Sequence, residues 1–114
     1  MKELRTLVEL DGALADSHEA AIFIFKHSTQ CPISAKAHGE VKGYLAQKGE
    51  SEPEGFLVKV IESRPVSNEI TQRLGLPHKS PQVILIKDGK VLWDESHLAI
   101  TADAIAQAVR ALDA

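Results

Sequence analysis

The only cysteine of the chain, Cys31, lies in the stretch FKHSTQCPISAK, residues 25–36. It follows a hydrophobic run and precedes a predicted helix. Three positions further on, where a dithiol oxidoreductase carries its second cysteine, the chain has Ser34. Because the thiolate is the reactive species in disulfide exchange, two alternatives are open. Cys31 is either a thiol that works without a partner or a small buried residue beside a proline.

A helix that starts at Cys31 would favour the first alternative. The N-terminus of a helix offers unpaired N–H groups and about half a positive charge, which stabilise a thiolate. Pro32 suits the first helical position, where a backbone N–H is not needed. Lys26 and His27 could add positive charge, but neighbouring strand residues point to opposite faces, so we expect only one of them to help. Ser34 cannot resolve a mixed disulfide, although its hydroxyl can donate a hydrogen bond to the thiolate.

Length and composition predict one domain, residues 1–114. The chain is 44% hydrophobic and 25% charged, as in ordinary globular proteins, and its net charge of -3 argues against a nucleic-acid surface. The first residues contain acids and no long apolar run, so we expect no signal peptide, and no later segment resembles a membrane span. A single cysteine excludes an intramolecular disulfide framework and a multi-cysteine metal site. These features predict a monomeric cytoplasmic protein.

Hydrophobic periodicity and capping residues predict alternating helices and strands. We expect four helices: residues 7–17 with Thr6 as the cap, residues 31–48, a helix that ends at Gly75 and is capped by Ser67 or a neighbour, and residues 101–112 capped by Thr101. Strands are expected over residues 20–25 and 55–62. Two more strands are expected within residues 82–95, on either side of the turn Asp88-Gly89.

This order predicts an α/β fold. Two strands joined by a helix form a parallel pair with a right-handed crossover, and the hairpin then adds antiparallel strands. The result is a four-stranded mixed sheet flanked by helices, the thioredoxin-like arrangement.

Several blocks of sequence sharpen this expectation. FKHSTQCPIS, RPVSN, HKSPQVILIKDGK and WDESHLAIT together resemble the YtxJ-like family of monothiol bacilliredoxins. The resemblance implies a thioredoxin fold with a cis-proline, Pro81, directly before the third strand. It also implies Cys31 as the nucleophile, Pro32 as the helix-opening proline and Ser34 at the vacant resolving position.

The resemblance further implies the chemistry. The enzyme would remove bacillithiol, a low-molecular-weight thiol, from S-bacillithiolated client proteins. Bacillithiol or another small thiol would be a co-substrate, and no tightly bound cofactor is expected.

Strand directions in this topology predict the neighbours of Cys31. One edge of the sheet collects the ends of the first two strands, the start of the third and the end of the fourth. There the backbone of Ser80 would pair with a small thiol, and Arg64 and His97 are candidate ligand residues. We expect His18 and His38 at the surface and no metal site, because no histidine pair has the spacing of metal ligands with a carboxylate partner.

Two other functions remain open at this stage. One is a monothiol glutaredoxin-like protein that uses another small thiol, although the motif CGFS of its iron–sulfur variants is absent. The other is a non-catalytic thioredoxin-like module in which capping of Cys31 alters a protein contact. Repeated turnover would separate an enzyme from such a sensor.

Overall fold

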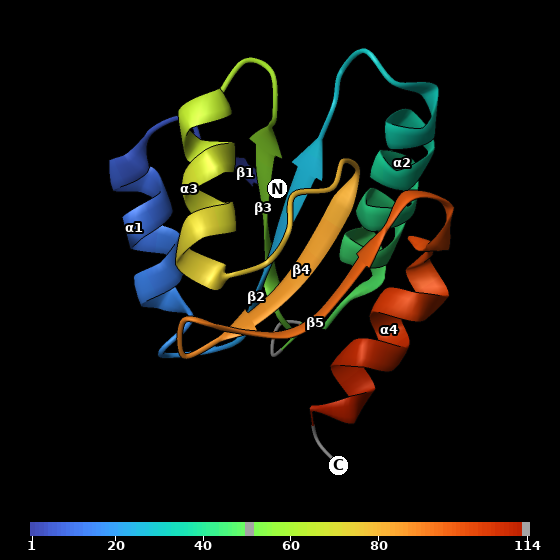
Figure 1. The fold of residues 1–114 in the computed structure, drawn as a ribbon. Coiled ribbons are helices and arrows are strands. Elements are labelled where there is room, and N and C mark those ends of the chain that lie inside the picture. Colours follow the sequence, from blue (N-terminus) through green and yellow to red (C-terminus); the bar gives the residue numbers. More distant parts are fainter. Residues whose placement is uncertain (50–51, 113–114) are drawn as a thin grey trace.

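The computed structural model describes residues 1–49 and 52–112 and consists of a sheet between two layers of helices (Figure 1). The elements in chain order are β1 (Lys2–Glu3), α1 (Leu7–Asp16), β2 (Ile22–His27), α2 (Pro32–Gln47), β3 (Glu54–Lys59), α3 (Arg64–Leu74), β4 (Gln82–Lys87), β5 (Lys90–Ser96), the short 3₁₀ helix η1 (His97–Ala99) and α4 (Ala102–Ala111). The strand order is β1-β3-β2-β4-β5. β3 is parallel to β1 and β2, whereas β4 is antiparallel to β2 and β5. The predicted α/β fold with a mixed sheet is therefore confirmed.

The sheet has five strands in the described chain, and the expected number of four was wrong. The additional strand, β1, is two residues long, with Lys2 opposite Phe56 and Glu3 opposite Leu57. Two residues are too short to show an alternating pattern. β1 is defined only by its pairing with a strand far along the chain, which no local signal reveals.

The two layers of helices enclose separate cores. In Figure 1, α1 and α3 lie on one side of the sheet, and α2 and α4 lie on the other. Alternate residues of β2 face the two sides: Ile24 packs with the first group, and Phe23 and Phe25 with the second. All six residues of β2 are buried, as expected for a strand in the middle of a sheet.

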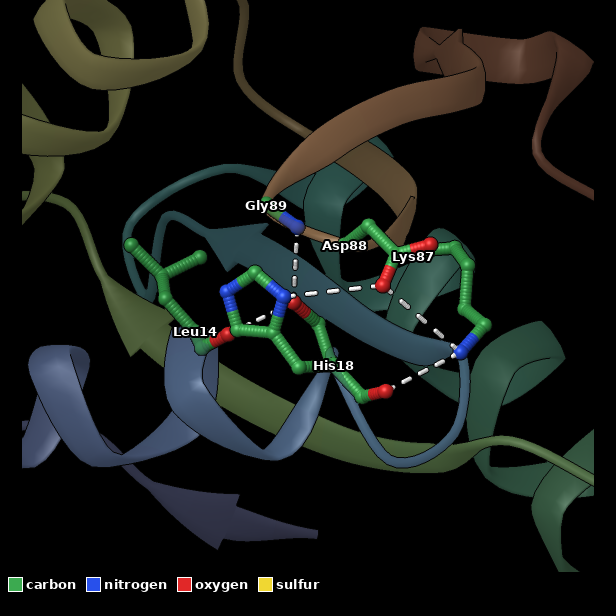
Figure 2. Close-up of polar contacts among 6 residues, drawn as sticks. Leu14, His18, Lys87, Asp88 and Gly89 are labelled. Atoms are coloured by element: carbon green, nitrogen blue, oxygen red, sulfur yellow. Dashed lines mark hydrogen bonds and ion pairs between the residues drawn. The ribbon is translucent and has the colours of Figure 1, made fainter.

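The turn between β4 and β5 is anchored on the end of α1 (Figure 2). Asp88 and Gly89 have φ angles of 55° and 72°, the left-handed values that the Asp-Gly pair predicted. The Asp88 N–H donates to the carbonyl of Ser17 at 2.9 Å, and the Gly89 N–H donates to its hydroxyl, also at 2.9 Å. The Ser17 hydroxyl donates in turn to the carbonyl of Leu14 at 2.6 Å. The hairpin is thus fixed to a buried serine.

Helix starts follow the predicted caps in two cases and depart from them in one. Thr6 and Thr101 accept hydrogen bonds from backbone N–H groups of α1 and α4 at 3.1 and 3.0 Å. α3, however, begins at Arg64, and Ser67 lies within it, so the expected cap was wrong. Pro65 in the first turn suits this earlier start, because that position needs no N–H. The helix ends as predicted at Gly75, which has a φ of 62°.

The topology gathers several chain segments at one edge of the sheet. β2 and β3 both end there, and α2 and α3 begin there, at the top of Figure 1. After α3 the chain runs back along the sheet to the same edge, where β4 begins. Because β5 is antiparallel to β4, it also ends there, close to η1.

Candidate active site

Cys31 directly precedes α2 at this edge. It is the N-cap residue of the helix, with φ and ψ of -116° and 123°, and Pro32 is the first helical residue. Its carbonyl accepts the N–H of Ala35 at 3.0 Å, as at the start of a regular helix. The thiol is free and partly exposed. Cys31 therefore stands at the N-terminus of α2, and its side chain makes no capping hydrogen bond to the helix.

Ser34, at the resolving position, is fully buried and hydrogen-bonded within the loop. Its hydroxyl oxygen accepts the Ser28 N–H at 2.9 Å and lies 2.8 Å from Nδ1 of His27. Burial lowers the pKa of His27, which favours the neutral ring at pH 7. Which of the two groups donates in this contact depends on which ring nitrogen of His27 carries the proton. In the described chain the Ser34 hydroxyl bonds to Ser28 and His27, and donation from Ser34 to the thiolate of Cys31 stays a prediction.

His27 belongs to an aromatic cluster between β2 and α2. Its ring stacks on Phe25 with centroids 5.6 Å apart and lies 4.5 Å from the ring of His38. Burial, followed by the proximity of His27, lowers the pKa of His38. His38 is therefore a partly buried packing residue and not the surface residue expected, whereas His18 is exposed.

The side chain of Lys26 lies on the opposite face of the sheet from that of His27, as predicted from strand alternation. Its side chain is 0% exposed. Its Nζ lies 3.1 Å from the hydroxyl of Thr71 on α3 and 3.1 Å from Nδ1 of His78. Burial lowers the pKa of Lys26 to about 8. The sequence pattern did not reveal this burial, since lysines are almost never fully buried without a charged partner.

Pro81 directly precedes β4 and contacts one of the predicted ligand residues, His97. The peptide bond between Ser80 and Pro81 is cis. The carbonyl of Pro81 accepts the N–H of His97 at 3.1 Å, and His97 has a left-handed φ of 55°. The backbone of His97 is thus tied to Pro81, while His97 itself is exposed.

Arg64 opens α3 at the same edge and is exposed. Its charge helps to lower the pKa of His78, after burial and the charge of Lys26. Within the described residues, Arg64 makes no ion pair.

A family model described as monothiol bacilliredoxin BrxC matches residues 2–105. The chain belongs to the monothiol bacilliredoxin family. Among solved structures, this bacilliredoxin is similar to a proposed oxidoreductase with a thioredoxin fold, at 27% identity and a TM-score of 0.82, over 94% of this chain and 91% of the other.

Two thioredoxins share the fold of the bacilliredoxin. The thioredoxin of Fasciola hepatica is 17% identical, with a TM-score of 0.76, over 97% of this chain and 98% of its own. Mitochondrial thioredoxin 3 of Saccharomyces cerevisiae is 16% identical, with a TM-score of 0.74, over 97% and 94%. The predicted thioredoxin-like fold is confirmed. With the family match, these findings identify a thiol-disulfide oxidoreductase that uses a thiol co-substrate.

Over residues 1–49 and 52–112, no three or more histidine, cysteine, aspartate or glutamate side chains are grouped so as to hold a metal ion. None of the described helices of the bacilliredoxin is long and apolar enough to cross a lipid bilayer.

Proposed function

We propose that this bacilliredoxin removes bacillithiol from protein mixed disulfides and that Cys31 is its nucleophile. One observation carries the proposal. The single thiol lies at the start of α2, while the resolving position holds a buried serine whose hydrogen bonds are taken within the loop. A site of this kind can accept a small thiol but cannot release it through a second cysteine of its own.

The reaction has two exchange steps. The Cys31 thiolate attacks the bacillithiol sulfur, a new disulfide forms between Cys31 and bacillithiol, and the client thiolate leaves and takes a proton from solvent. A second low-molecular-weight thiol then attacks the bacillithiol sulfur, breaks that disulfide and frees Cys31 as thiolate. The small-molecule disulfide carries away the oxidising equivalents. No tightly bound cofactor takes part in either step.

We assign the remaining site residues supporting roles within this proposal. Pro32 opens the helix beneath the thiol, and Ser34 holds the loop in place. Pro81 and the backbone of Ser80 form the surface along which the mixed disulfide lies. Arg64 and His97 are exposed at the same edge, where a cationic or hydrogen-bonding side chain can meet a carboxylate of the small thiol.

The setting of the enzyme belongs to the same proposal. Its partners are S-bacillithiolated client proteins and the small thiol, and neither a nucleic acid nor a membrane is involved. We propose that residues 1–114 form one domain that acts as a monomer in the cytoplasm, because a reducing compartment keeps thiols free.

Intact mass spectrometry tests the proposal directly. Reduced protein is mixed with a bacillithiolated model protein, and Cys31→Ser serves as the control. We expect the wild type to gain one bacillithiol while the model protein loses it, and added free thiol to reset the enzyme for another round.

Other outcomes of this experiment would change the function. Transfer of glutathione but not bacillithiol would retain the nucleophile and assign a different small thiol. A single capping event that free thiol does not reverse would identify a redox-sensing module. Transfer by the Cys31→Ser variant would refute Cys31 as the acceptor.

A further inference from the structure

Two fully buried polar side chains lie next to each other on neighbouring inner strands, at the edge of the sheet near Cys31. Lys26 on β2 and Gln82 on β4 are paired in register, and both are 0% exposed. Lys26 contacts Thr71 on α3, and Gln82 shares its strand face with Ile84 and Ile86, which pack in the same core as α3 residues. A pair of polar groups at such a place requires buried partners.

Both side chains form hydrogen bonds with the same loop, between α3 and β4. Nζ of Lys26 lies 3.1 Å from Nδ1 of His78, and the carbonyl oxygen of the Gln82 side chain accepts the N–H of Lys79 at 3.4 Å. At their other ends, Lys26 bonds Thr71 at 3.1 Å and the Gln82 amide donates to Asp94 on β5 at 3.3 Å. We call Lys26, Gln82, Thr71 and Asp94 the loop clamp.

The clamp is a costly way to stabilise a fold. A buried charge is expensive, and hydrophobic residues of similar volume usually serve stability as well or better. Lys26 makes no ion pair with any carboxylate of the described residues. Its position is therefore better explained by the segment it fixes than by the stability it contributes.

That segment leads directly to the proposed substrate surface. His78 and Lys79 immediately precede Ser80 and Pro81. The hydroxyl of Ser80 is buried and has no hydrogen-bond partner among the described residues, so the side chain of Ser80 does not anchor its own backbone. The clamp on the two preceding residues supplies that anchor.

We propose that Lys26 is a positioning residue that, through the clamp, sets the place of the Ser80 backbone for the mixed-disulfide substrate. This inference rests on the proposed function. Lys26 acts on substrate binding and not on the sulfur chemistry, so its loss raises KM for the bacillithiolated protein while Cys31 retains its intrinsic reactivity.

The test compares Lys26→Met with Lys90→Met, a matched change at an exposed lysine at the start of β5. For Lys26→Met we expect KM to rise on the order of tenfold, as for loss of a hydrogen bond to a charged group. We expect kcat and the rate at which iodoacetamide alkylates Cys31 to stay at wild-type values. Amide hydrogen exchange at Lys79 should become faster. Lys90→Met should change none of these.

Two results would contradict the positioning role of Lys26. An unchanged KM for Lys26→Met would refute the positioning role. A slower alkylation of Cys31 in the same variant would overturn it in favour of an electrostatic effect on the thiol. If Lys26→Met does not fold, Thr71→Val removes one partner of the clamp and should raise KM to a smaller extent; an unchanged KM would again refute it.

Hydrogen exchange separates failure of this inference from failure of the proposed function. If the wild type does not turn over the bacillithiolated protein, the substrate proposal fails, and exchange at Lys79 still tests the clamp. Faster exchange in Lys26→Met would support the clamp as the anchor of this loop. Unchanged exchange would refute it.

Discussion

Replacing Lys26 by methionine should stabilise the protein at neutral pH, and the gain should shrink as the pH rises. The Lys26 side chain is 0% exposed, and burial lowers its pKa from 10.5 to about 8. This difference corresponds to roughly 3 kcal/mol for burying the charged form. Methionine fills the same space without a charge, so the cost disappears, offset in part by two lost hydrogen bonds.

The sign of the pH dependence follows from proton binding. Between about pH 8 and pH 10.5, the unfolded chain keeps the proton on Lys26 while the folded protein loses it. The unfolded state thus binds more protons, and the free energy of unfolding of the wild type rises with pH through this window. The cost is fully present below about pH 8. The methionine variant lacks this titration, so its advantage should fall by roughly 2 kcal/mol between about pH 8 and pH 9.5.

Urea denaturation at about pH 7 and about pH 9.5 measures this difference. Apart from His78, whose pKa the charge of Lys26 helps to lower, the titrating groups are shared by the two proteins and cancel in the comparison, and Lys90→Met should show no trend. A stability difference between wild type and Lys26→Met that stays constant over this range would refute the reasoning, because it would mean that Lys26 titrates alike in the folded and unfolded chains.

Three further substitutions test other parts of the structure. Ser34→Ala leaves two buried hydrogen-bond partners in the active-site loop unsatisfied and should cost about 1–3 kcal/mol in urea denaturation, whereas the exposed Thr29→Ala should cost less than about 0.5 kcal/mol. His38→Leu should reduce the loss of stability on acidification below pH 6.5, since the folded-state pKa of His38 lies below 6.5 and the unfolded chain takes the proton first. Ser17→Ala removes the acceptor of a turn N–H and should cost about 1–3 kcal/mol, whereas His18→Ala, which loses only an exposed ion pair, should be near neutral in thermal denaturation.

Local signals accounted for most of the fold. The Asp88-Gly89 turn, the two threonine caps and the buried strand before Cys31 each depend on a few neighbouring residues, and the structure has all of them. β1 was missed because its two residues become a strand only through pairing with β3. The start of α3 was misplaced because both Ser63 and Ser67 are residue types that cap helices, and tertiary packing buries Ser67 within the helix.

In the candidate site, too, some features follow from local sequence and others depend on tertiary contacts. The place of Cys31 at a helix start follows from the neighbouring proline and the hydrophobic run before it. The burial of Lys26 and Gln82 does not, because a polar residue at the end of an apolar strand normally reads as the point where the strand meets solvent. Only the contacts with Thr71, with Asp94 and with the loop before β4 explain how they are satisfied.

The monothiol character is thus built into the loop and is not only the absence of a second sulfur. The oxygen of Ser34 accepts the Ser28 N–H at 2.9 Å and lies 2.8 Å from Nδ1 of His27, and no solvent reaches it. A thiol is a weaker acceptor than a hydroxyl, so a cysteine at this position would loosen the loop that places Cys31. The hydrogen bonds of Ser34 therefore fix the loop before Cys31, the proposed nucleophile, while a serine at the resolving position offers no thiol for exchange. In the proposed mechanism, release of the bound thiol must then come from outside the protein.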